Sequence, residues 1–291
     1  MNKARILRGI KYALRILPDK AYIQIYYFLK FKRLCNFRNP KTFNEKLNWL
    51  KLYDRKPEYQ MIVDKARVKD YVASILGDQY IIPTLGVWDR FDDIDFNKLP
   101  DSFVLKCTHD SAGIVIVQDK AKMNRAQAKK EIEYALTQNF YYIGREWPYK
   151  YVPPRIIAEP FLSDDVHGEL RDYKFYCFNG IPKIMFVVTG RAQKKLCFDF
   201  FDMDYNHLQM RQSAPNADMI LEKPKTFEKM IEFASTLSKG YPHVRVDFYE
   251  VNGKLFFGEL TLYDSSGFSA FQPTKWDEVL GNWIVLPTKN K

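Results

Sequence analysis

The fold is decided by residues 244–261, which read VRVDFYEVNGKLFFGELT. Two apolar-rich runs flank Asn252-Gly253, and this dipeptide is a strong signal for a two-residue hairpin turn. Because side chains alternate along a strand, Arg245 and Asp247 share one face, and pairing across the turn brings Glu259 near Asp247. Carboxylates among apolar neighbours need a counter-charge, which magnesium with bound phosphates would supply. An exposed hairpin face stabilised by Arg245 alone would explain the same pattern.

The first part of the chain has helical patterns. Pro18-Asp19 breaks the first helix, and Thr42-Phe43-Asn44-Glu45 matches a capping box at the start of another. A further helix is expected from Pro57-Glu58 through Val72, and Gly77 is suited to end it.

Strands begin after residue 78, in antiparallel hairpins with intervening helices. This order is typical of an α+β fold and not of an alternating parallel sheet. We therefore expect a mostly helical region over 1–77, a central lobe over 78–160 and a C-terminal lobe over 161–291. The predicted strands lie at 103–106, 114–117, 155–162, 172–178, 182–188, 196–201, 244–250 and 254–260, and the predicted helices among them start at Asn124 and near 226.

Composition places the chain among ordinary globular proteins. Of its 291 residues, 46% are hydrophobic and 27% charged, which excludes a disordered chain, and the 13 Gly and 15 Pro exclude a collagen-like one. The four cysteines form no cluster with metal-site spacing, and no stretch has the roughly 18–20 apolar residues of a membrane span. With no secretory signal in view, this usage predicts a cytoplasmic protein.

Positive charge is concentrated near the beginning of the chain. The formal net charge is +10, and residues 1–51 contain thirteen Lys and Arg against only Asp19 and Glu45. Basic and apolar residues alternate there at close to helical spacing. The pattern predicts either a helix that lies on an anionic membrane through residues 1–34 or a packed helix with a solvated basic face. Nucleic-acid binding has no recognition motif to support it.

Lys106 ends a β-rich run that starts at Phe103, and a loop of small and polar residues follows it. A lysine at a strand end, with backbone amides beyond it, suits a phosphate group. Thr108, Ser111 and Gly113 are the expected loop contacts. A hairpin with a solvated lysine would give the same sequence.

The apolar strand 156–162 ends in a connector, which can offer backbone donors and acceptors to an adenine edge. Glu159 and the later acids Asp164, Asp165 and Glu169 are candidates to bind ribose hydroxyls. A buried strand followed by a solvated acidic loop is the plainer interpretation of the same residues.

The run Asp172-Tyr173-Lys174-Phe175-Tyr176 is predicted to be a strand. Alternation places Asp172, Lys174 and Tyr176 on one face, where Lys174 would meet a terminal phosphate. A half-exposed strand without a ligand would look the same.

The order of these motifs resembles that of the ATP-grasp superfamily and, more narrowly, that of the TupA-like ATP-grasp family of polysaccharide and teichuronopeptide biosynthesis. The resemblance covers about residues 35–275 and implies an ATP-grasp fold with ATP between the central and C-terminal lobes. The runs that carry it are Thr42 to Leu47, the Lys106 segment, Asp172 to Gly180, and Arg245 to Tyr249.

The resemblance also implies roles for particular residues. Lys65, with Asp64 on a helix, and Lys106 would be phosphate-binding lysines, and residues 159–162 would form the adenine hinge. Arg245 would hold the reacting carboxylate and Ser266-Gly267 the acceptor. The expected catalytic residues are Arg245 and Lys174, the expected magnesium ligands are Asp247, Glu259 and Thr261, and the expected ATP contacts are Lys65, Lys106, Thr108, Ser111, Gly113, Glu159, Pro160, Phe161, Leu162, Asp164, Glu169, Asp172 and Lys174.

Two departures from the family pattern stand out. Thr261 replaces the usual asparagine and is a poorer magnesium ligand, so that a water or Asp264 would complete the second ion's shell. The phosphate loop has fewer glycines than usual, and Asp110 in it would repel a triphosphate unless it points away or touches metal.

The resemblance implies an ATP-dependent ligase that phosphorylates a carboxylate for attack by an amine. A +10 protein suits anionic substrates, and we expect an amino acid to be joined to the carboxylate of an acidic sugar in surface polysaccharide synthesis. One alternative is a glycosyltransferase that uses Asp202-Met203-Asp204, which follows an apolar strand but also fits a turn. Another is a non-catalytic protein that binds anionic surfaces.

Overall fold

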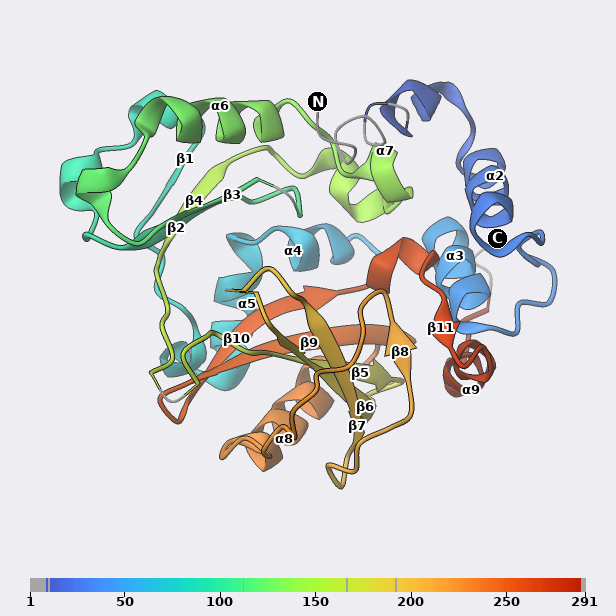
Figure 1. The fold of residues 1–291 in the computed structure, drawn as a ribbon. Coiled ribbons are helices and arrows are strands. Elements are labelled where there is room, and N and C mark those ends of the chain that lie inside the picture. The colour runs from blue at the N-terminus through green and yellow to red at the C-terminus, as the bar shows by residue number, and fades with distance from the viewer. Residues whose placement is uncertain (1–8, 10, 112, 166, 192, 289–291) are drawn as a thin grey trace. The chain divides into compact units, whose positions relative to one another are not determined.

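The computed structural model describes residues 9, 11–111, 113–165, 167–191 and 193–288. The chain divides into two compact units, which we name by their sheets (Figure 1). The five-stranded unit comprises residues 1–55 and 163–291, and the four-stranded unit comprises residues 56–162. The expected three-part division at residues 77 and 160 stays a prediction.

The five-stranded unit is built on an antiparallel sheet with the order β10-β9-β5-β6-β7. A small pair, β8 and β11, lies outside this sheet. Helix α8 packs against β5, β6 and β9 of the large sheet. The bounds are β5 Asp172–Phe178, β6 Ile181–Thr189, β7 Cys197–Asp202, β8 Arg211–Gln212, α8 Phe227–Leu237, β9 His243–Val251, β10 Lys254–Thr261 and β11 Phe271–Gln272.

The predicted hairpin joins β9 to β10. Asn252 and Gly253 both have positive φ, 50° and 77°, as the tight turn that suits the twist of a hairpin requires. Asp247 pairs with Glu259, so the expected neighbourhood of these two carboxylates is confirmed. The register shifts between Phe257 and Glu259, which marks a bulge at this point of β10.

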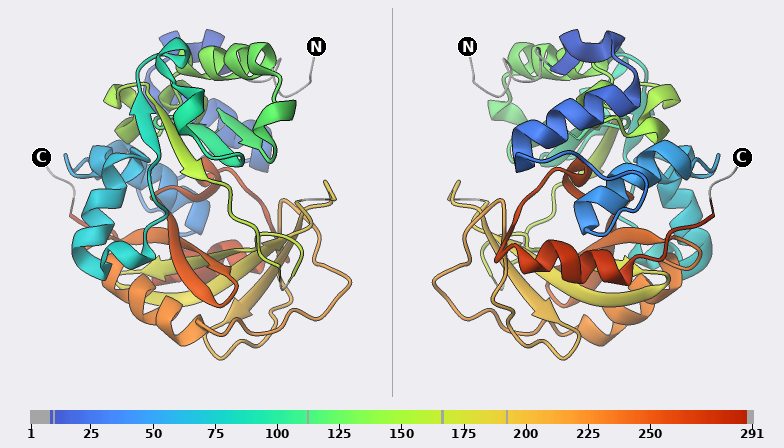
Figure 2. Two further views of the ribbon diagram at one scale, coloured as in Figure 1. Left: turned by 90° about the vertical axis from the view of Figure 1, so that its left-hand side faces the viewer. Right: turned by 90° about the vertical axis from the view of Figure 1, so that its right-hand side faces the viewer.

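Helices α2, α3 and α9 of the five-stranded unit carry the early and last segments of the chain (Figure 2). The predicted capping box is confirmed, because Thr42 accepts from the Glu45 amide and Glu45 accepts from the Thr42 amide. Tyr22, Ile23 and Tyr27 of α2 are buried, so α2 is a packed helix. The bounds are η1 Leu14–Ile16, α2 Asp19–Phe31, α3 Phe43–Tyr53, η7 Asp264–Gly267 and α9 Lys275–Trp283.

The four-stranded unit has an antiparallel sheet with the order β1-β4-β2-β3. Its core lies between this sheet and α6, where Phe103, Leu105, Ile132 and Ile156 are fully buried. The bounds are α4 Tyr59–Val63, α5 Arg67–Leu76, η2 Asp78–Tyr80, β1 Gly86–Trp88, η3 Phe91–Asp93, η4 Phe96–Lys98, β2 Phe103–Cys107, β3 Ile114–Val117, η5 Lys120–Lys122, α6 Arg125–Leu136, α7 Tyr141–Gly144, η6 Trp147–Tyr151 and β4 Ile156–Pro160.

The single helix predicted from Pro57 to Val72 is wrong, because the chain breaks into α4 and α5 at Asp64. The Asp64 carboxylate accepts from the amides of Ala66 at 2.9 Å and Arg67 at 3.3 Å, and this local bonding competes with a continuous helix. Lys65 therefore lies in a turn and not on a helix.

None of the helices in the described part of the chain is both long and apolar enough to cross a membrane.

Candidate functional site

A row of charged side chains runs across three neighbouring strands. The register places Asp247 of β9 opposite Lys174 of β5 on one side and opposite Glu259 of β10 on the other. Lys174 Nζ donates to Asp247 Oδ2. The strand pairing therefore brings together the residues that the sequence predicted to bind magnesium and the terminal phosphate.

Arg245 lies in the centre of this charged cluster. Its guanidinium donates to Asp247 Oδ1 and Oδ2 at 2.7 and 2.8 Å and to Glu259 Oε1 at 3.0 Å. It also donates to Thr261 Oγ1 at 3.1 Å and to Asp264 Oδ1. Burial acts to lower the pKa of Arg245, but the carboxylates of Asp247 and Asp264 outweigh it and raise that pKa well above its ordinary value. Arg245 is thus a permanent, oriented cation.

Asp172 extends the charged cluster along β5. Its carboxylate accepts from Arg191, and it lies 3.8 Å from Lys174 Nζ. Burial acts to raise the pKa of Asp172, but Lys174 and Arg191 outweigh it and hold that pKa below its usual range. The charged cluster has a formal excess of one negative charge, and its members are the cations Lys174, Arg191 and Arg245 and the carboxylates Asp172, Asp247, Glu259 and Asp264.

The donor set of the charged cluster fits magnesium. Carboxylate and hydroxyl oxygens are the ligands that this ion prefers, and one or two carboxylates suffice where substrate phosphates supply the rest. Within the described ranges no group of three or more His, Cys, Asp or Glu is arranged to hold a metal by itself. Both oxygens of Asp247 accept from cations, whereas the Glu259 side chain is 42% exposed. Glu259 is therefore the more accessible of the two carboxylates.

The four-stranded unit contains a second charged group, around Glu159. Lys106 Nζ and Lys69 Nζ each lie 2.5 Å from a different oxygen of its carboxylate. Burial acts to raise the pKa of Glu159, but the two lysines outweigh it and lower that pKa. Lys69, on α5, was not predicted as a site residue, and nothing in its local sequence distinguishes it from an exposed helical lysine. Glu159 thus anchors Lys106, which is a role different from that expected of a ribose ligand.

In the predicted phosphate loop, Thr108, His109, Asp110 and Gly113 are buried. Thr108 Oγ1 donates to the Pro153 carbonyl at 3.3 Å, and Lys65 Nζ donates to the Asp110 carbonyl at 2.7 Å. Asp110 is 1% exposed, and its Oδ1 accepts from the Ser111 amide. Ser111 is exposed.

Gly113 is the last residue of this loop. Glycine is needed there because of close packing, not because of an unusual φ. A Cβ added at Gly113 would lie 2.5 Å from Cys107 Sγ and 2.6 Å from the Ala135 Cβ. The loop backbone can therefore approach α6 closely only with glycine at this position.

Three predicted acidic residues stabilise turns. Asp164 accepts from the Asn252 amide at 3.0 Å, at the β9–β10 turn. Glu169 accepts from the Gly190 amide at 2.8 and 3.1 Å, in the segment after β6. Asp165 donates its amide to Asn252 Oδ1 at 3.1 Å.

Asp202, the first residue of the possible sugar-nucleotide motif, ends β7 and accepts hydrogen bonds from the turn that follows. Its Oδ1 accepts from the amides of Asp204 at 3.0 Å and Asn206 at 2.8 Å, and its Oδ2 accepts from the Asn206 side chain at 3.0 Å. This bonding supports the turn interpretation of Asp202-Met203-Asp204.

A left-handed loop lies in η7, a few residues after β10. Ser265, Ser266 and Gly267 have φ of 47°, 55° and 67° in succession, a conformation that is costly for side-chain-bearing residues. Strained backbone of this kind is concentrated at functional sites.

Buried polar side chains of α3 fix the carbonyls of this loop. Lys51 Nζ donates to the Ser266 carbonyl at 2.8 Å, and Asn48 Nδ2 donates to the Gly267 carbonyl at 2.7 Å. Asn44 Nδ2 donates to the Ser269 carbonyl at 2.9 Å. The run that begins at Thr42 was predicted as a capping box, but its contacts with these carbonyls were not predicted. The signal in the sequence is the helical spacing of three polar residues, Asn44, Asn48 and Lys51.

Solved structures that resemble this chain include two D-alanine–D-alanine ligases and a D-cycloserine synthetase. A D-alanine–D-alanine ligase from Bacillus anthracis complexed with ATP is 14% identical, with a TM-score of 0.40, and 69% of this chain and 54% of that chain are covered. The ligase of that name from Helicobacter pylori is 17% identical, with a TM-score of 0.43 and coverage of 79% and 60%. A D-cycloserine synthetase is 16% identical, with a TM-score of 0.42 and coverage of 79% and 72%. The chain thus spans little more than half the length of the first two.

No curated protein matches the chain. The family model described as TupA-like ATPgrasp matches residues 45–285, which include the charged cluster, the Lys106–Glu159 pair and the left-handed loop. The chain belongs to the TupA-like ATP-grasp family, as the order of its motifs predicted.

Proposed function

We propose that the protein is an ATP-dependent carboxylate–amine ligase that works through an acyl phosphate. The observation that carries this proposal is the position of Arg245 among three carboxylates, one of which, Asp247, pairs with Lys174 across β5 and β9. Such an arrangement supplies oriented positive charge where a carboxylate and a phosphoryl group would meet, and electrostatic stabilisation of that kind dominates phosphoryl transfer.

The reaction proceeds in two balanced steps. A carboxylate oxygen of the substrate attacks the γ-phosphorus of ATP, and ADP leaves with the electron pair of the broken P–O bond. The amine of the second substrate then attacks the carbonyl carbon, inorganic phosphate leaves and the amine proton passes to solvent. Arg245 would hold the carboxylate, and Lys174 would neutralise the phosphoryl group as it moves.

Magnesium would be held by Glu259 and Asp247, with Thr261 or Asp264 as a further oxygen donor. When bound, the ion supplies charge neutralisation for the phosphate oxygens. The fold of the β9–β10 hairpin would position these oxygen donors. The bulge in β10 lies directly before Glu259, and pairing with β9 places Thr261 opposite Arg245.

ATP contacts are proposed in the four-stranded unit as well. Lys106, held by Glu159, and Lys65 would bind phosphate oxygens, together with the exposed Ser111. Residues 160–162 would border the adenine. Glu159 is better suited to orient Lys106 than to bind ribose, because both its oxygens already accept from lysines.

The proposed substrates are an amino acid, as the amine, and the carboxylate of an acidic sugar in surface (capsular) polysaccharide synthesis. The net charge of +10 supports an anionic substrate. Membership of the TupA-like family supports the polysaccharide setting.

A peripheral contact with an anionic membrane is proposed for the first part of the chain. Ile25, Phe28 and Leu29 of α2 share one helical face and are 47%, 49% and 59% exposed. Basic residues surround them in the sequence, and this combination of apolar and basic side chains favours an anionic lipid surface.

Isotope transfer tests the reaction type. A substrate carboxylate labelled with oxygen-18 is expected to pass one label to inorganic phosphate, with ADP as the nucleotide product. The assay runs a panel of uronates beside a panel of amino acids. AMP with pyrophosphate would contradict the acyl-phosphate route, and a nucleoside diphosphate released from a sugar donor without ATP use would establish the glycosyltransferase.

A further inference from the structure

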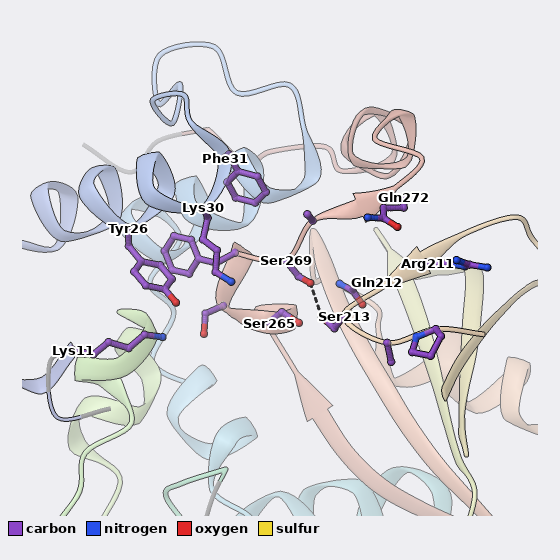
Figure 3. A pocket seen from close by; sticks show the side chains of 15 residues that line it. Lys11, Tyr26, Lys30, Phe31, Arg211, Gln212, Ser213, Ser265, Ser269 and Gln272 are labelled. Carbon is purple, nitrogen blue, oxygen red and sulfur yellow. Dashed lines mark hydrogen bonds between the residues drawn. The ribbon is translucent and has the colours of Figure 1, made fainter. Parts of the chain in front are cut away.

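The five-stranded unit contains a cavity of about 730 Å³ (Figure 3). Its walls come from the segment before η1, from α2, from β8 with the residues that follow it, and from the left-handed loop and β11. The lining residues include Lys11, Tyr26, Lys30, Gln212, Ser265 and Phe268.

The lining of the cavity is cationic and rich in hydroxyl groups. Lys11 and Lys30 both reach it from the α2 side in Figure 3, and no Asp or Glu stands among the described residues that line it. Ser213 and Ser269 meet across it through a hydrogen bond of 2.8 Å between their hydroxyls. Such a lining favours a ligand with negative charge and several hydroxyl groups.

One aromatic wall completes the cavity. The rings of Tyr26 and Phe268 pack edge to face with their centroids 4.7 Å apart, and Lys11 Nζ lies 4.3 Å from the Tyr26 ring centroid. An apolar ring face beside hydroxyl donors suits a ligand that has both C–H and O–H groups, as a sugar ring does.

The cavity is joined to the charged cluster by one buried side chain. Gln212 lines the cavity, and its Nε2 donates to Asp264 Oδ2 at 2.8 Å. The other oxygen of Asp264 accepts from Arg245. Ser265, the next residue, lines the cavity in turn, so a ligand in the cavity lies next to the proposed reaction centre.

We propose that this cavity binds the body of the carboxylate substrate, and that this body carries a second anionic group besides the carboxylate that reacts. The inference rests on the proposed function. Arg245, the proposed partner of the reacting carboxylate, does not line the cavity, so Lys11 and Lys30 provide for a different negative charge. The second group is either the carboxylate of a linked uronate or a phosphate.

The cavity volume agrees with a substrate larger than one sugar. A volume of about 730 Å³ lies within the range of pockets that bury a drug-sized ligand, about 300–1,000 Å³, and therefore leaves room for more than one sugar ring. Lys11, Tyr26 and Lys30 precede residue 45, where the family match begins. The segment before the matched region therefore contributes the determinants of substrate choice.

Calorimetry without ATP tests the subsite apart from catalysis. The ligands are galacturonate, trigalacturonate, UDP-glucuronate and inorganic phosphate, each titrated into the full chain. The variant carries Lys11→Ala and Lys30→Ala, and Lys20→Ala, an exposed lysine on α2 outside the cavity, is the control. We expect trigalacturonate or UDP-glucuronate to bind at least about tenfold more tightly than galacturonate. In the double variant, the affinity for that larger ligand alone should fall about tenfold.

The outcomes separate the two proposals. If trigalacturonate binds more tightly, the second anionic group is the carboxylate of a linked uronate. If UDP-glucuronate binds more tightly, it is a phosphate. Either result supports the subsite. Equal affinity for monomer and larger ligands, no binding by the wild type, or an equal loss in Lys20→Ala would overturn it. So would lysine-dependent binding to phosphatidylglycerol vesicles with no saccharide affinity. Saccharide binding without ADP release from any carboxylate would instead count against the ligase.

Discussion

Gln212 and Asp264 are joined by a buried hydrogen bond of 2.8 Å, although they come from β8 and from the left-handed loop. Tyr176 donates to the same Gln212 side chain at 3.2 Å, which fixes the orientation of its amide. Burial acts to raise the pKa of Asp264, but Arg245 outweighs it and lowers that pKa. Asp264 therefore stays ionised and holds Arg245 from the side of the cavity, so the direction of the guanidinium depends on the buried bonds of Gln212 and Asp264.

Neutralising the proposed metal ligands is expected to abolish most turnover. Asp247→Asn and Glu259→Gln each remove a charge that would balance magnesium, and we expect a loss of about 10²-fold or more in ADP release for each. Glu228→Gln, an exposed carboxylate on α8, is the matched control. Circular dichroism checks folding, and wild-type turnover in both variants would rule out the metal assignment.

Lys106→Ala is expected to weaken ATP more than adenosine, because the proposed partner of Lys106 is a phosphate. Calorimetry with both ligands measures the difference, and a charge-assisted contact predicts about a tenfold or larger loss for ATP alone. Lys122→Ala, an exposed lysine that pairs with Asp119, is the control. Equal weakening of both ligands would show that Lys106 acts through the fold of the four-stranded unit.

Two glycine substitutions separate backbone strain from close packing. Gly267 and Gly240 both have positive φ, but a Cβ at Gly267 would lie 2.8 Å from Asn48 Nδ2, whereas nothing lies within 4 Å at Gly240. We expect Gly240→Ala to cost about 1–2 kcal/mol in the free energy of unfolding and Gly267→Ala clearly more. Urea unfolding measures both. Equal costs would mean that α3 does not constrain the loop.

His243 is expected to make stability depend on pH. Burial lowers its pKa to about 4, and Phe43, Tyr176 and Phe178 surround its ring. The unfolded chain, with a histidine pKa near 6.5, takes up a proton first as the pH falls, so the free energy of unfolding decreases between pH 6.5 and 4.

Urea unfolding of wild type and His243→Phe at pH 7 and pH 5 checks this dependence. From these pKa values we expect the wild type to lose about 2 kcal/mol more than the variant over that range. The same loss in both proteins would exclude His243 as the cause.

The apolar face of α2 is expected to promote binding to anionic vesicles. Replacing Phe28 and Leu29 by serine removes about 3 kcal/mol of burial if both insert, so binding to phosphatidylglycerol vesicles should fall at least about tenfold. Met219 and Ile220, 58% and 94% exposed, provide a matched pair of serine substitutions elsewhere. Equal losses from the two pairs, or no binding by the wild type at low salt, would leave α2 as a packed helix only.

Local signals made part of this structure predictable from the sequence. The Asn252-Gly253 turn and the Thr42 capping box act over a few residues, and both are confirmed. The alternation of side chains along β5 and β9 also predicted which faces carry Lys174 and Asp247. These two residues lie side by side because the two strands pair at these positions.

Contacts between distant segments were not predictable in the same way. The break at Asp64 depends partly on Arg155, which donates to its carboxylate at 3.0 Å from 91 residues away. Lys69 was overlooked because its partner Glu159 lies on another element. The cavity has no sequence signature, since four separate segments form it.

The hydrogen bonds from α3 to the left-handed loop have a consequence for the synthesis of the chain. Asn48 and Gly267 are 219 residues apart, and Asn44 bonds to Ser269 across 225. A chain still emerging from the ribosome therefore has α3 long before the loop that α3 must fix. Before residues 265–269 have been made, α3 has no partner for these bonds, so a chain released at an earlier point lacks the loop beside the charged cluster.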